Sequence, residues 1–329
     1  AGNQAVRLST AEEPTGFVDV GGLAPLKEFH RKLLMSGRKP VKAIPRGTLL
    51  LGVPGAGKDW YAEALGKELR WPVLHLHLGR TRSRYQGDTE QNTVEVFRKA
   101  DRMAPCILSI SEIEKMFTGL ESSGRTDGGT KANQIAEFLD WMQRRKEPVY
   151  LLASCNDITP ILETMPEFLR PGRFDRLFYL DVPSEEAQEQ IWAIHARAYG
   201  LLRPFGIEPR HLMSPGAKEP SPAAIREAVQ KLDRPPLSVR QAWTGAEIEG
   251  CCAAADLSGE PPSSPECLPT VIANIAAERI AKTREWATGK TYSADYAGVY
   301  QGPRNTSQQV DDALAGKFRR TVRRKEEVN

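Results

Sequence analysis

The chain has 329 residues, of which 40% are hydrophobic and 26% are charged, and its formal net charge is +3. This size suits about two packed domains, excludes a chain that is disordered throughout, and gives no reason to expect a polyanionic partner. No apolar run approaches the ~18 residues of a membrane span and the N-terminus does not resemble a secretory signal, so we predict a cytoplasmic protein without membrane contact. Because the chain begins with Ala1 and not Met, we expect processing or trimming, and whether an N-terminal module is missing stays open.

Strands and helices alternate through the first half of the chain. Thr48–Leu51 is an apolar strand that leads into a glycine-containing loop, and Asp59–Leu69 follows as a helix. The same patterns predict strands at 73–78, 106–110, 149–154 and 177–183, and helices at 89–103 and 131–144. This alternation predicts an α/β fold in which helices flank a parallel sheet.

From Ser184 onward the pattern is helical only. The predicted helices cover 184–200, 223–232, 244–255 and 268–288, and proline-rich loops separate them. We therefore divide the chain into an α/β nucleotide-binding domain at 1–183, a small all-helical lid domain at 184–300 and a basic C-terminal tail at 301–329.

The stretch Gly52–Lys58 has the GxxxxGK spacing of a phosphate-binding loop. In such a loop backbone amides surround a phosphate, the lysine reaches the outer phosphates, and a helix N-terminus adds positive potential. The residue after the lysine is usually Ser or Thr and helps to hold Mg²⁺, but this chain has Asp59.

A second departure lies at the end of the strand at 106–110. Ser111-Glu112 stands where proteins with this phosphate-binding loop usually carry Asp-Glu. A hydroxyl and a carboxylate have therefore changed places between positions 59 and 111. We predict that the two side chains meet, that Asp59 binds Mg²⁺ directly and that Ser111 supports it. A carboxylate beside the phosphates costs roughly 4 kcal/mol per charge pair at 4 Å unless the metal neutralises it. Slow or conditional hydrolysis of a bound nucleotide, and a complete loss of that hydrolysis, both stay open.

Taken in order, these motifs resemble the AAA family of ring ATPases, whose fold is the P-loop NTPase sheet followed by a helical lid. The resemblance implies ATP and Mg²⁺ as cofactors. It implies that Phe17–Leu23 lines the adenine pocket and that Thr244–Glu249 closes over the base and ribose. The residues that it assigns to nucleotide binding are Val20, Gly21, Gly55, Ala56, Gly57, Lys58, Asp59, Gly245 and Ala246.

The resemblance also implies four catalytic residues. Glu112 matches the catalytic glutamate, and Asn156 matches the sensor that orients the attacking water. Arg170 and Arg173 resemble paired arginine fingers that face a neighbour's nucleotide, where a finger can be worth roughly 10³–10⁵ in rate. The resemblance also implies a homo-oligomeric ring, for which we expect six subunits.

A narrower similarity is to the poorly characterised AAA proteins of cyanobacteria and algal plastids. It rests on Ala104–Cys106, Glu112–Lys115, Cys155–Ile158 and Thr283–Lys290. That subfamily carries Asp where this chain has Ser111 and Ser or Thr where it has Asp59, so the departure concerns metal binding and not the fold.

Four further segments have two interpretations each. Arg84, Tyr85, Gln86 and Gly87 stand where ring translocases present a pore loop; Tyr85 either grips an extended chain or is a partly buried loop residue. Gly119–Gly129 is a second axial loop or a connector, and the basic run at 317–325 is a solvated tail or a nucleic-acid contact. His75 and His77 share a strand face but lack a partner at ligand spacing, so we expect no metal there.

Three functions follow from these observations. The first is a ring-forming ATPase that uses hydrolysis to remodel or assemble a protein partner, and the complete set of Glu112, Asn156 and both arginines favours it. The second is a nucleotide-binding scaffold or regulatory subunit with impaired hydrolysis, which Asp59 and Ser111 favour. The third and weakest is a nucleic-acid remodelling ATPase that uses the basic tail. The sequence does not identify a client.

Overall fold

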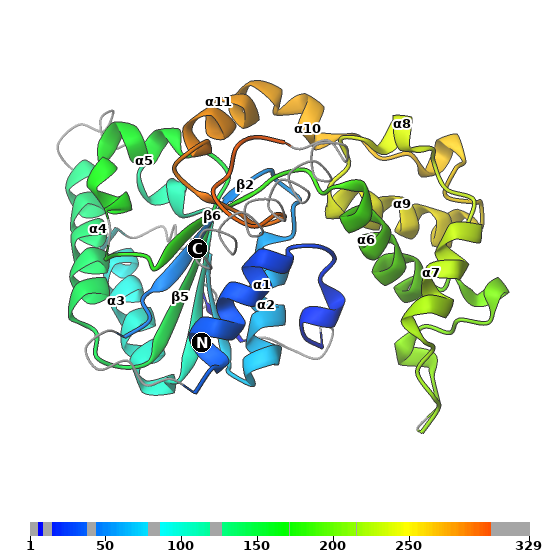
Figure 1. Ribbon diagram of the computed structural model, residues 1–329. Helices are drawn as coiled ribbons and strands as arrows, with labels where there is room; N and C mark the ends of the chain where they lie inside the picture. The colour runs from blue at the N-terminus through cyan, green and yellow to red at the C-terminus, as the bar shows by residue number, and fades with distance from the viewer. Residues whose placement is uncertain are drawn as a thin grey trace, which may run out of the picture.

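The computed structural model describes residues 6–8, 15–37, 44–77, 86–118, 127–170, 172–214 and 216–303. Within this part of the chain, seven strands form one sheet in the order β1-β3-β4-β5-β2-β6-β7 (Figure 1). β1 is antiparallel to β3, and the other neighbours are parallel. The strands are β1 Val6–Leu8, β2 Gly47–Gly52, β3 Val73–His77, β4 Cys106–Ser111, β5 Val149–Cys155, β6 Arg176–Leu180 and β7 Tyr292–Ser293. The predicted parallel α/β fold is confirmed, although the edge strand β1 was not expected.

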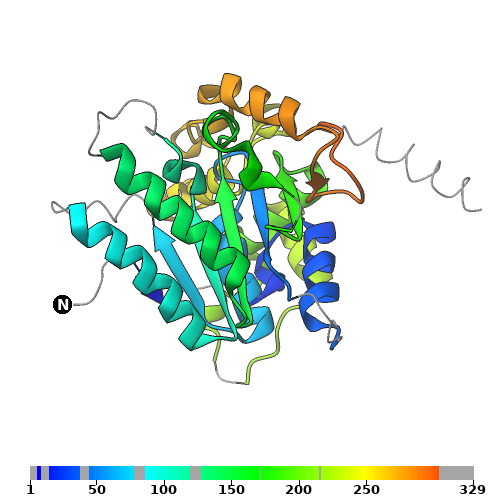
Figure 2. The ribbon, with the colours of Figure 1, turned by 90° about the vertical axis from the view of Figure 1, so that its left-hand side faces the viewer.

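Two pairs of helices cover the sheet. Helices α1 and α2 lie on one face and α3 and α4 on the other (Figures 1 and 2). Side chains of β2 alternate between them: Leu49 and Leu51 pack in the cluster that contains Phe138 of α4, whereas Leu50 packs with Tyr61 of α2. These helices are α1 Ala24–His30, α2 Lys58–Leu69, α3 Gln86–Met103 and α4 Asp127–Arg144, and the short α5 Thr159–Thr164 follows β5. Because the central strand is buried on both faces, its sequence is a continuous apolar run.

The helical region has a core of its own. It comprises α6 Glu185–Ala198, α7 Pro222–Lys231, α8 Leu237–Arg240 and α9 Gly245–Ser258. The indole rings of Trp192 and Trp243 are buried at its centre with Ile248. Hydroxyl side chains begin the helices, since Ser184 and Ser221 each accept a backbone N–H at the first turn of α6 and α7.

The last predicted helix, at 268–288, is instead two helices. α10 Ile272–Ile275 and α11 Ala277–Ala287 are separated by Ala276, whose φ of −99° and ψ of 18° are not helical. Ala276 and Ile280 pack against Val53 next to the sheet, so the chain bends here to reach the α/β part.

The expectation of helices alone after Ser184 is wrong at Tyr292–Ser293, which pair in parallel with β6. The Arg176 guanidinium lies 4.0 Å from the centre of the Tyr292 ring, and Ala294 is buried in the core beneath α1 and α2. The predicted lid range of 184–300 therefore contains a segment that returns to the sheet. We call residues 288–303 the C-terminal strap.

Asp181, the residue after β6, holds the strap in place. Its carboxylate accepts hydrogen bonds from the Tyr300 hydroxyl of the strap and from the guanidinium of Arg284 on α11, whose Nε lies 3.0 Å away. The Ala294 N–H of the strap also donates to Tyr179 O at 3.1 Å. One buried carboxylate thus joins the sheet, the last helix and the strap.

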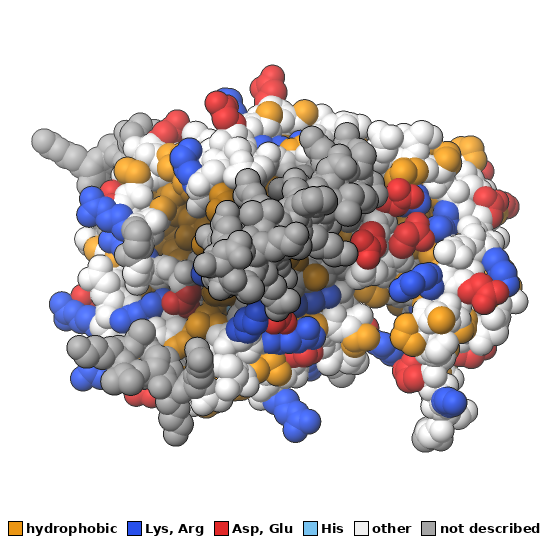
Figure 3. Space-filling view, in the orientation of Figure 1, with side chains coloured by type: hydrophobic (Ala, Val, Ile, Leu, Met, Phe, Trp, Pro, Cys, Tyr) orange, Lys and Arg blue, Asp and Glu red, His pale blue; other side chains and the backbone are white. Residues whose placement is uncertain are grey.

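Several predicted features fall at or beyond the edge of the described residues. The basic tail after 303, Arg84 and Tyr85 lie outside them, as does 119–126 of the predicted glycine-rich loop. Residues 127–129 of that loop are helical because α4 begins at Asp127. No helix in the described part of the chain is both long and apolar enough to span a bilayer. On the face shown in Figure 3, basic and acidic side chains are intermixed.

The strap gives a pH-dependent contribution to stability. Burial and the charge of Asp181 raise the pKa of Asp295 to about 7. In the unfolded chain the Asp295 carboxyl ionises near pH 4. Below that pH the neutral carboxyl makes its full contribution to the stability of the folded state, and this contribution is lost as the pH rises to about 7. We expect Asp295→Asn to raise the free energy of unfolding by about 4 kcal/mol at pH 8 and to change it little at pH 4. Urea denaturation at both pH values measures this, with the exposed Asp256→Asn as control; an equal effect at both would contradict it.

Candidate functional site

The site lies at the carboxyl edge of the sheet. Strands β4, β5, β2 and β6 are neighbours in that order, and the residues that follow each of them surround a cavity of about 360 Å³. Parallel strands place ligand sites at this edge because their following loops converge there. The volume falls within the range of small-molecule sites.

The loop after β2 wraps one end of the cavity. Gly55 and Gly57 have φ values of 82° and 80°, which favour glycine. They turn the chain so that α2 begins at Lys58, with its N-terminus at the cavity. A helix N-terminus with free N–H groups attracts anions such as phosphate. The local geometry therefore suits the predicted phosphate-binding loop.

The amino group of Lys58 is buried against its own loop. Its Nζ donates to the carbonyl oxygens of Gly52 at 2.9 Å and Val53 at 2.8 Å. Burial lowers the pKa of Lys58 to about 8. A phosphate beside this amine would favour its charged form and restore the pKa upward.

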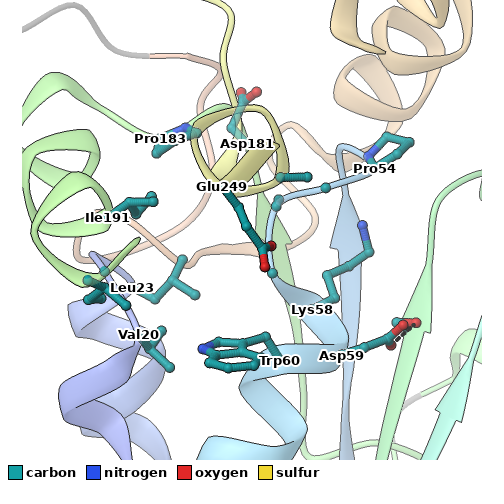
Figure 4. A pocket seen from close by; sticks show the side chains of 18 of the residues that line it. Val20, Leu23, Pro54, Lys58, Asp59, Trp60, Asp181, Pro183, Ile191 and Glu249 are labelled. Carbon is teal, nitrogen blue, oxygen red and sulfur yellow. Dashed lines mark hydrogen bonds between the residues drawn. The ribbon is translucent and has the colours of Figure 1, made fainter. Parts of the chain in front are cut away.

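Asp59 and Ser111 meet, as the exchange between these positions leads one to expect. The Ser111 hydroxyl donates to Asp59 Oδ1 at 3.0 Å. A second hydroxyl, that of Ser154 on β5, donates to the same oxygen at 3.1 Å. Among the described residues we find no hydrogen bond to Asp59 Oδ2. The carboxylate is thus fixed by two strands at the wall of the cavity (Figure 4).

Ser154 also organises the next residue of the site. Its Oγ accepts the backbone N–H of Glu112 at 3.2 Å, and Glu112 has a left-handed φ of 55° that turns the chain after β4. The Glu112 carboxylate lines the cavity and pairs with Lys115. Sequence analysis missed Ser154, although its place near the end of β5 could have indicated it.

Asn156 follows β5 and lines the same cavity. Its backbone N–H donates to Glu114 Oε1 at 3.1 Å. Burial raises the pKa of the Glu114 carboxyl, which is 7% exposed. Glu114 is a second residue that the sequence analysis did not select, and it fixes the backbone at Asn156.

The other end of the cavity is apolar. Val20 and Leu23, from the segment before α1, face Ile191 of α6 (Figure 4). A Cβ atom on Gly21 would lie 2.4 Å from Ile191 Cγ1, so glycine allows α6 to pack this closely. The predicted contact residues Val20 and Gly21 therefore line a pocket that would suit a planar base.

The helical region closes the cavity through α9. Gly245 and Ala246 line it, and the Ala246 N–H donates to Gly55 O of the phosphate loop at 3.2 Å. A capping box between Thr244 and Glu247 fixes the start of α9. Two helix N-termini, those of α2 and α9, thus border one cavity.

The two predicted arginine fingers do not join this cavity within one chain. Arg170 is exposed and Arg173 is half-buried, and neither lines the cavity. Burial lowers the pKa of Arg173. Its Nη1 has no hydrogen-bond partner in the described part of the chain.

The remaining candidates lie elsewhere. Gln86 and Gly87 form the start of α3, whereas Arg84 and Tyr85 are outside the described residues. The His75 ring contacts the Glu63 carboxylate.

The donor set suits Mg²⁺ at Asp59. This ion prefers oxygen ligands, and a carboxylate with one oxygen anchored by hydroxyls offers a fixed, hard ligand. Ser111 and Ser154 would hold that ligand in place and would not need to bind the metal themselves.

The family model described as "ATPase family associated with various cellular activities (AAA)" matches residues 48–182. A protein of Gracilaria tenuistipitata var. liui, "Uncharacterized AAA domain-containing protein ycf46", is 36% identical over 190 residues, which is 56% of this chain and 38% of that protein. The protein of the same name from Guillardia theta is 30% identical over 240 residues, which is 71% of this chain and 46% of that protein. "ATP-dependent zinc metalloprotease FtsH" of Thermus thermophilus is 30% identical over 220 residues, which is 64% of this chain and 34% of that protein. The chain spans less than half the length of these relatives.

Lys58→Ala should abolish most ATP binding and leave the fold intact, because the hydrogen bonds that its amine forms within the described residues go to two carbonyl oxygens of its own loop. In the parent, ATP affinity should fall as the pH rises through about 8, since the free amine loses its charge there. Calorimetry from pH 6.5 to 9.5 measures both effects. The alanine variant should show the parent's melting temperature without nucleotide and no comparable pH dependence; undiminished ATP affinity would contradict the assignment of the loop.

Proposed function

Given that residues 48–182 form an AAA domain, we propose that the protein binds ATP with Mg²⁺ in this cavity and hydrolyses it. One observation carries the proposal. The Asp59 carboxylate is held by two hydroxyls beside Lys58, in a cavity that Glu112 and Asn156 also line. A site that served only to bind a nucleotide would not need the last two residues there.

In this proposal each side chain has a separate task. The phosphate loop and Lys58 bind the phosphates, and Asp59 holds Mg²⁺, which offsets the negative charge of the phosphates when it is bound. Glu112 accepts a proton from the attacking water, and Asn156 orients that water. Glu112 must leave Lys115 to do so, which makes that ion pair a resting arrangement of the base.

In this proposal the protein forms a homo-hexameric ring that remodels or assembles a protein partner. Support comes from the similarity to a family whose members form rings and from the position of Arg170 and Arg173 away from their own chain's cavity. Each subunit would place these two guanidinium groups at the nucleotide of its neighbour. The buried and unpartnered Nη1 of Arg173 would then find an acceptor there.

A scaffold with impaired hydrolysis is the second candidate, and Asp59 supports it. A carboxylate within a few ångströms of the outer phosphates opposes binding unless Mg²⁺ is present. Phosphate release, measured on the same sample whose mass is followed with and without ATP, separates the candidates. Assembly with sustained Mg²⁺-dependent release supports the enzyme; assembly without release supports the scaffold.

Nucleic-acid remodelling is the weakest candidate. It rests on the basic run at 317–325, which lies outside the described residues. Binding of DNA or RNA that weakens steeply with salt would support it.

The exchanged pair gives a sharper test of hydrolysis. If Asp59 and Ser111 compensate for each other, Asp59→Thr removes the only carboxylate of the pair and Ser111→Asp crowds two carboxylates together, so both should lower Mg²⁺-dependent hydrolysis. The double variant should recover or exceed the parent's rate, with a coupling of about 1 kcal/mol. Initial rates across a Mg²⁺ titration measure this. Additive gains from the two single changes would indicate a decayed site.

Mixing experiments test the shared site. Arg173→Ala subunits keep Glu112, and Glu112→Gln subunits keep Arg173, so a mixed interface can contain both intact residues. The mixture should hydrolyse ATP faster than the sum of the separate variants, as phosphate release at several mixing ratios will measure. Exchange of subunits is verified by native mass measurement. A mixture that exchanges but stays at the summed rate would show that Arg173 does not act across the interface.

A further inference from the structure

The loop that joins α6 to α7 forms an arm on the helical region. We call the residues of this loop that the structure describes, 203–214 and 216–221, the lid arm. Two short 3₁₀ turns lie in it, Arg203–Phe205 and Arg210–Leu212. A connection between neighbouring helices usually needs fewer residues, and loops of this length often carry a function. The proposed roles of the phosphate loop and of the apolar pocket do not use this arm.

A buried arginine of α6 fixes the lid arm. The side chain of Arg197 is 6% exposed, and its Nη1 lies 2.8 Å from Glu219 Oε2 near the end of the arm. Its Nε donates to Glu208 O, in the first half of the arm, at 3.0 Å. Hydrogen bonds from a charged donor are stronger than neutral ones. Because one guanidinium joins two separate points of the arm to α6, the arm moves together with the lid.

Arg210 extends from the lid arm to the α/β domain. Its Nη1 forms an ion pair with Asp19 Oδ1, and its Nε lies 3.4 Å from Glu219 Oε1 of the same arm. The side chain of Asp19 is 13% exposed and that of Arg210 is 37% exposed. An ion pair with one partner shielded from water is screened less than a fully exposed pair. The contact joins two segments that are 191 positions apart in the chain.

Asp19 belongs to the wall of the cavity, next to Val20. Its Oδ2 accepts the N–H and the hydroxyl of Thr15, both at 2.7 Å, so the carboxylate also fixes the turn before α1. Its backbone oxygen accepts the indole N–H of Trp60 at 2.7 Å, and Trp60, on α2, lines the same cavity (Figure 4). The ion pair of Arg210 and Asp19 therefore connects the lid arm with the apolar end of the cavity.

Two further contacts join the lid to loops that line the cavity. The bond from the Ala246 N–H to Gly55 O lies beside the phosphate loop. At the apolar end, the Gly22 N–H donates to Gln190 Oε1 of α6 at 3.0 Å. Residues of both domains thus form the walls of the cavity, and the contacts between the domains keep these walls together.

We propose that Arg210, through its ion pair with Asp19, holds the lid closed and limits the rate at which nucleotides enter and leave the cavity. The inference rests on the proposed binding of a nucleotide there. Opening of a lid limits product release in many enzymes. The pair joins two protein side chains and needs no ligand, so its loss should speed entry and exit alike and leave the equilibrium affinity nearly unchanged. A residue that bound the nucleotide itself would instead change the affinity.

Stopped-flow fluorescence of ADP that carries an N-methylanthraniloyl group measures both rate constants, and hydrolysis does not complicate a diphosphate. Calorimetry with unlabelled ADP measures the equilibrium affinity. The matched control is Arg203, which pairs with Glu208 inside the lid arm, so that Arg203→Ala and Arg203→Glu repeat the charge changes made at Arg210. Relative to Arg203→Ala, Arg210→Ala should raise both rate constants about fivefold, as expected for loss of a partly shielded ion pair, and should change the affinity by less than about twofold.

Two further variants separate the charge of Arg210 from its packing. Arg210→Glu places a carboxylate opposite Asp19, so it should raise both rate constants more than Arg210→Ala does. Its excess over Arg203→Glu should shrink as the NaCl concentration rises from about 50 to about 500 mM, because salt screens the repulsion. Arg210→Lys keeps the charge and should stay close to the parent. Melting temperatures without nucleotide verify that each variant is folded.

Several outcomes would overturn the inference. Rate constants in Arg210→Ala and Arg210→Glu that equal those of their matched controls would remove the role of the ion pair and leave the proposed nucleotide binding standing. A weakened affinity with an unchanged association rate would assign Arg210 to ligand binding and not to the lid. An excess in Arg210→Glu that salt does not reduce would indicate a change in packing. A parent that binds no ADP would overturn the proposed function as well, so the two failures are distinguishable.

Discussion

The hydrogen bonds from two serine hydroxyls to one carboxylate oxygen hold the site together. Asp59 is in the first turn of α2, Ser111 ends β4 and Ser154 is in β5, so these bonds connect the phosphate loop's helix with two strands. Ser154 uses its own oxygen to fix the backbone of Glu112. A shift of any of these elements would disturb the loop, the carboxylate and Glu112 together. The rest of the cavity is positioned relative to this junction.

The added negative charge at position 59 lies close to several sources of positive potential. The N-termini of α2 and α9 border the cavity, and Lys58 is the buried cation beside the carboxylate. Each helix terminus favours an anion by a few tenths to about 1 kcal/mol, and more where it is partly buried. The same field serves a phosphate, so Asp59 and an incoming nucleotide draw on a common source of positive potential.

Much of the fold and of one end of the site could be predicted from the sequence. The apolar run Thr48–Leu51 before GxxxxGK places the loop at the end of a strand, and the alternation of strands and helices gives the parallel sheet. Residues at strand ends, such as Glu112 and Asn156, could be located because parallel strands end at one edge. The two edge strands, β1 and β7, could not be predicted. They have three and two residues, which is too few for a periodic pattern to be recognised. Ser154, Asp295 and Arg210 depend on contacts between segments far apart in sequence, which local patterns do not contain.

The C-terminal strap has a consequence for how the cavity is made during synthesis. Domains fold from the N-terminus as the chain emerges, and the Gly52–Lys58 loop, the strand-end residues Glu112 and Asn156, and helices α6 to α9 all precede the strap. Asp295, which lines the cavity, and Tyr300, which bonds Asp181, emerge after them. A nascent chain therefore has an unfinished cavity until β7 has docked on β6. The cavity that Asp295 lines is therefore complete only after the strap has been synthesised and β7 has paired with β6.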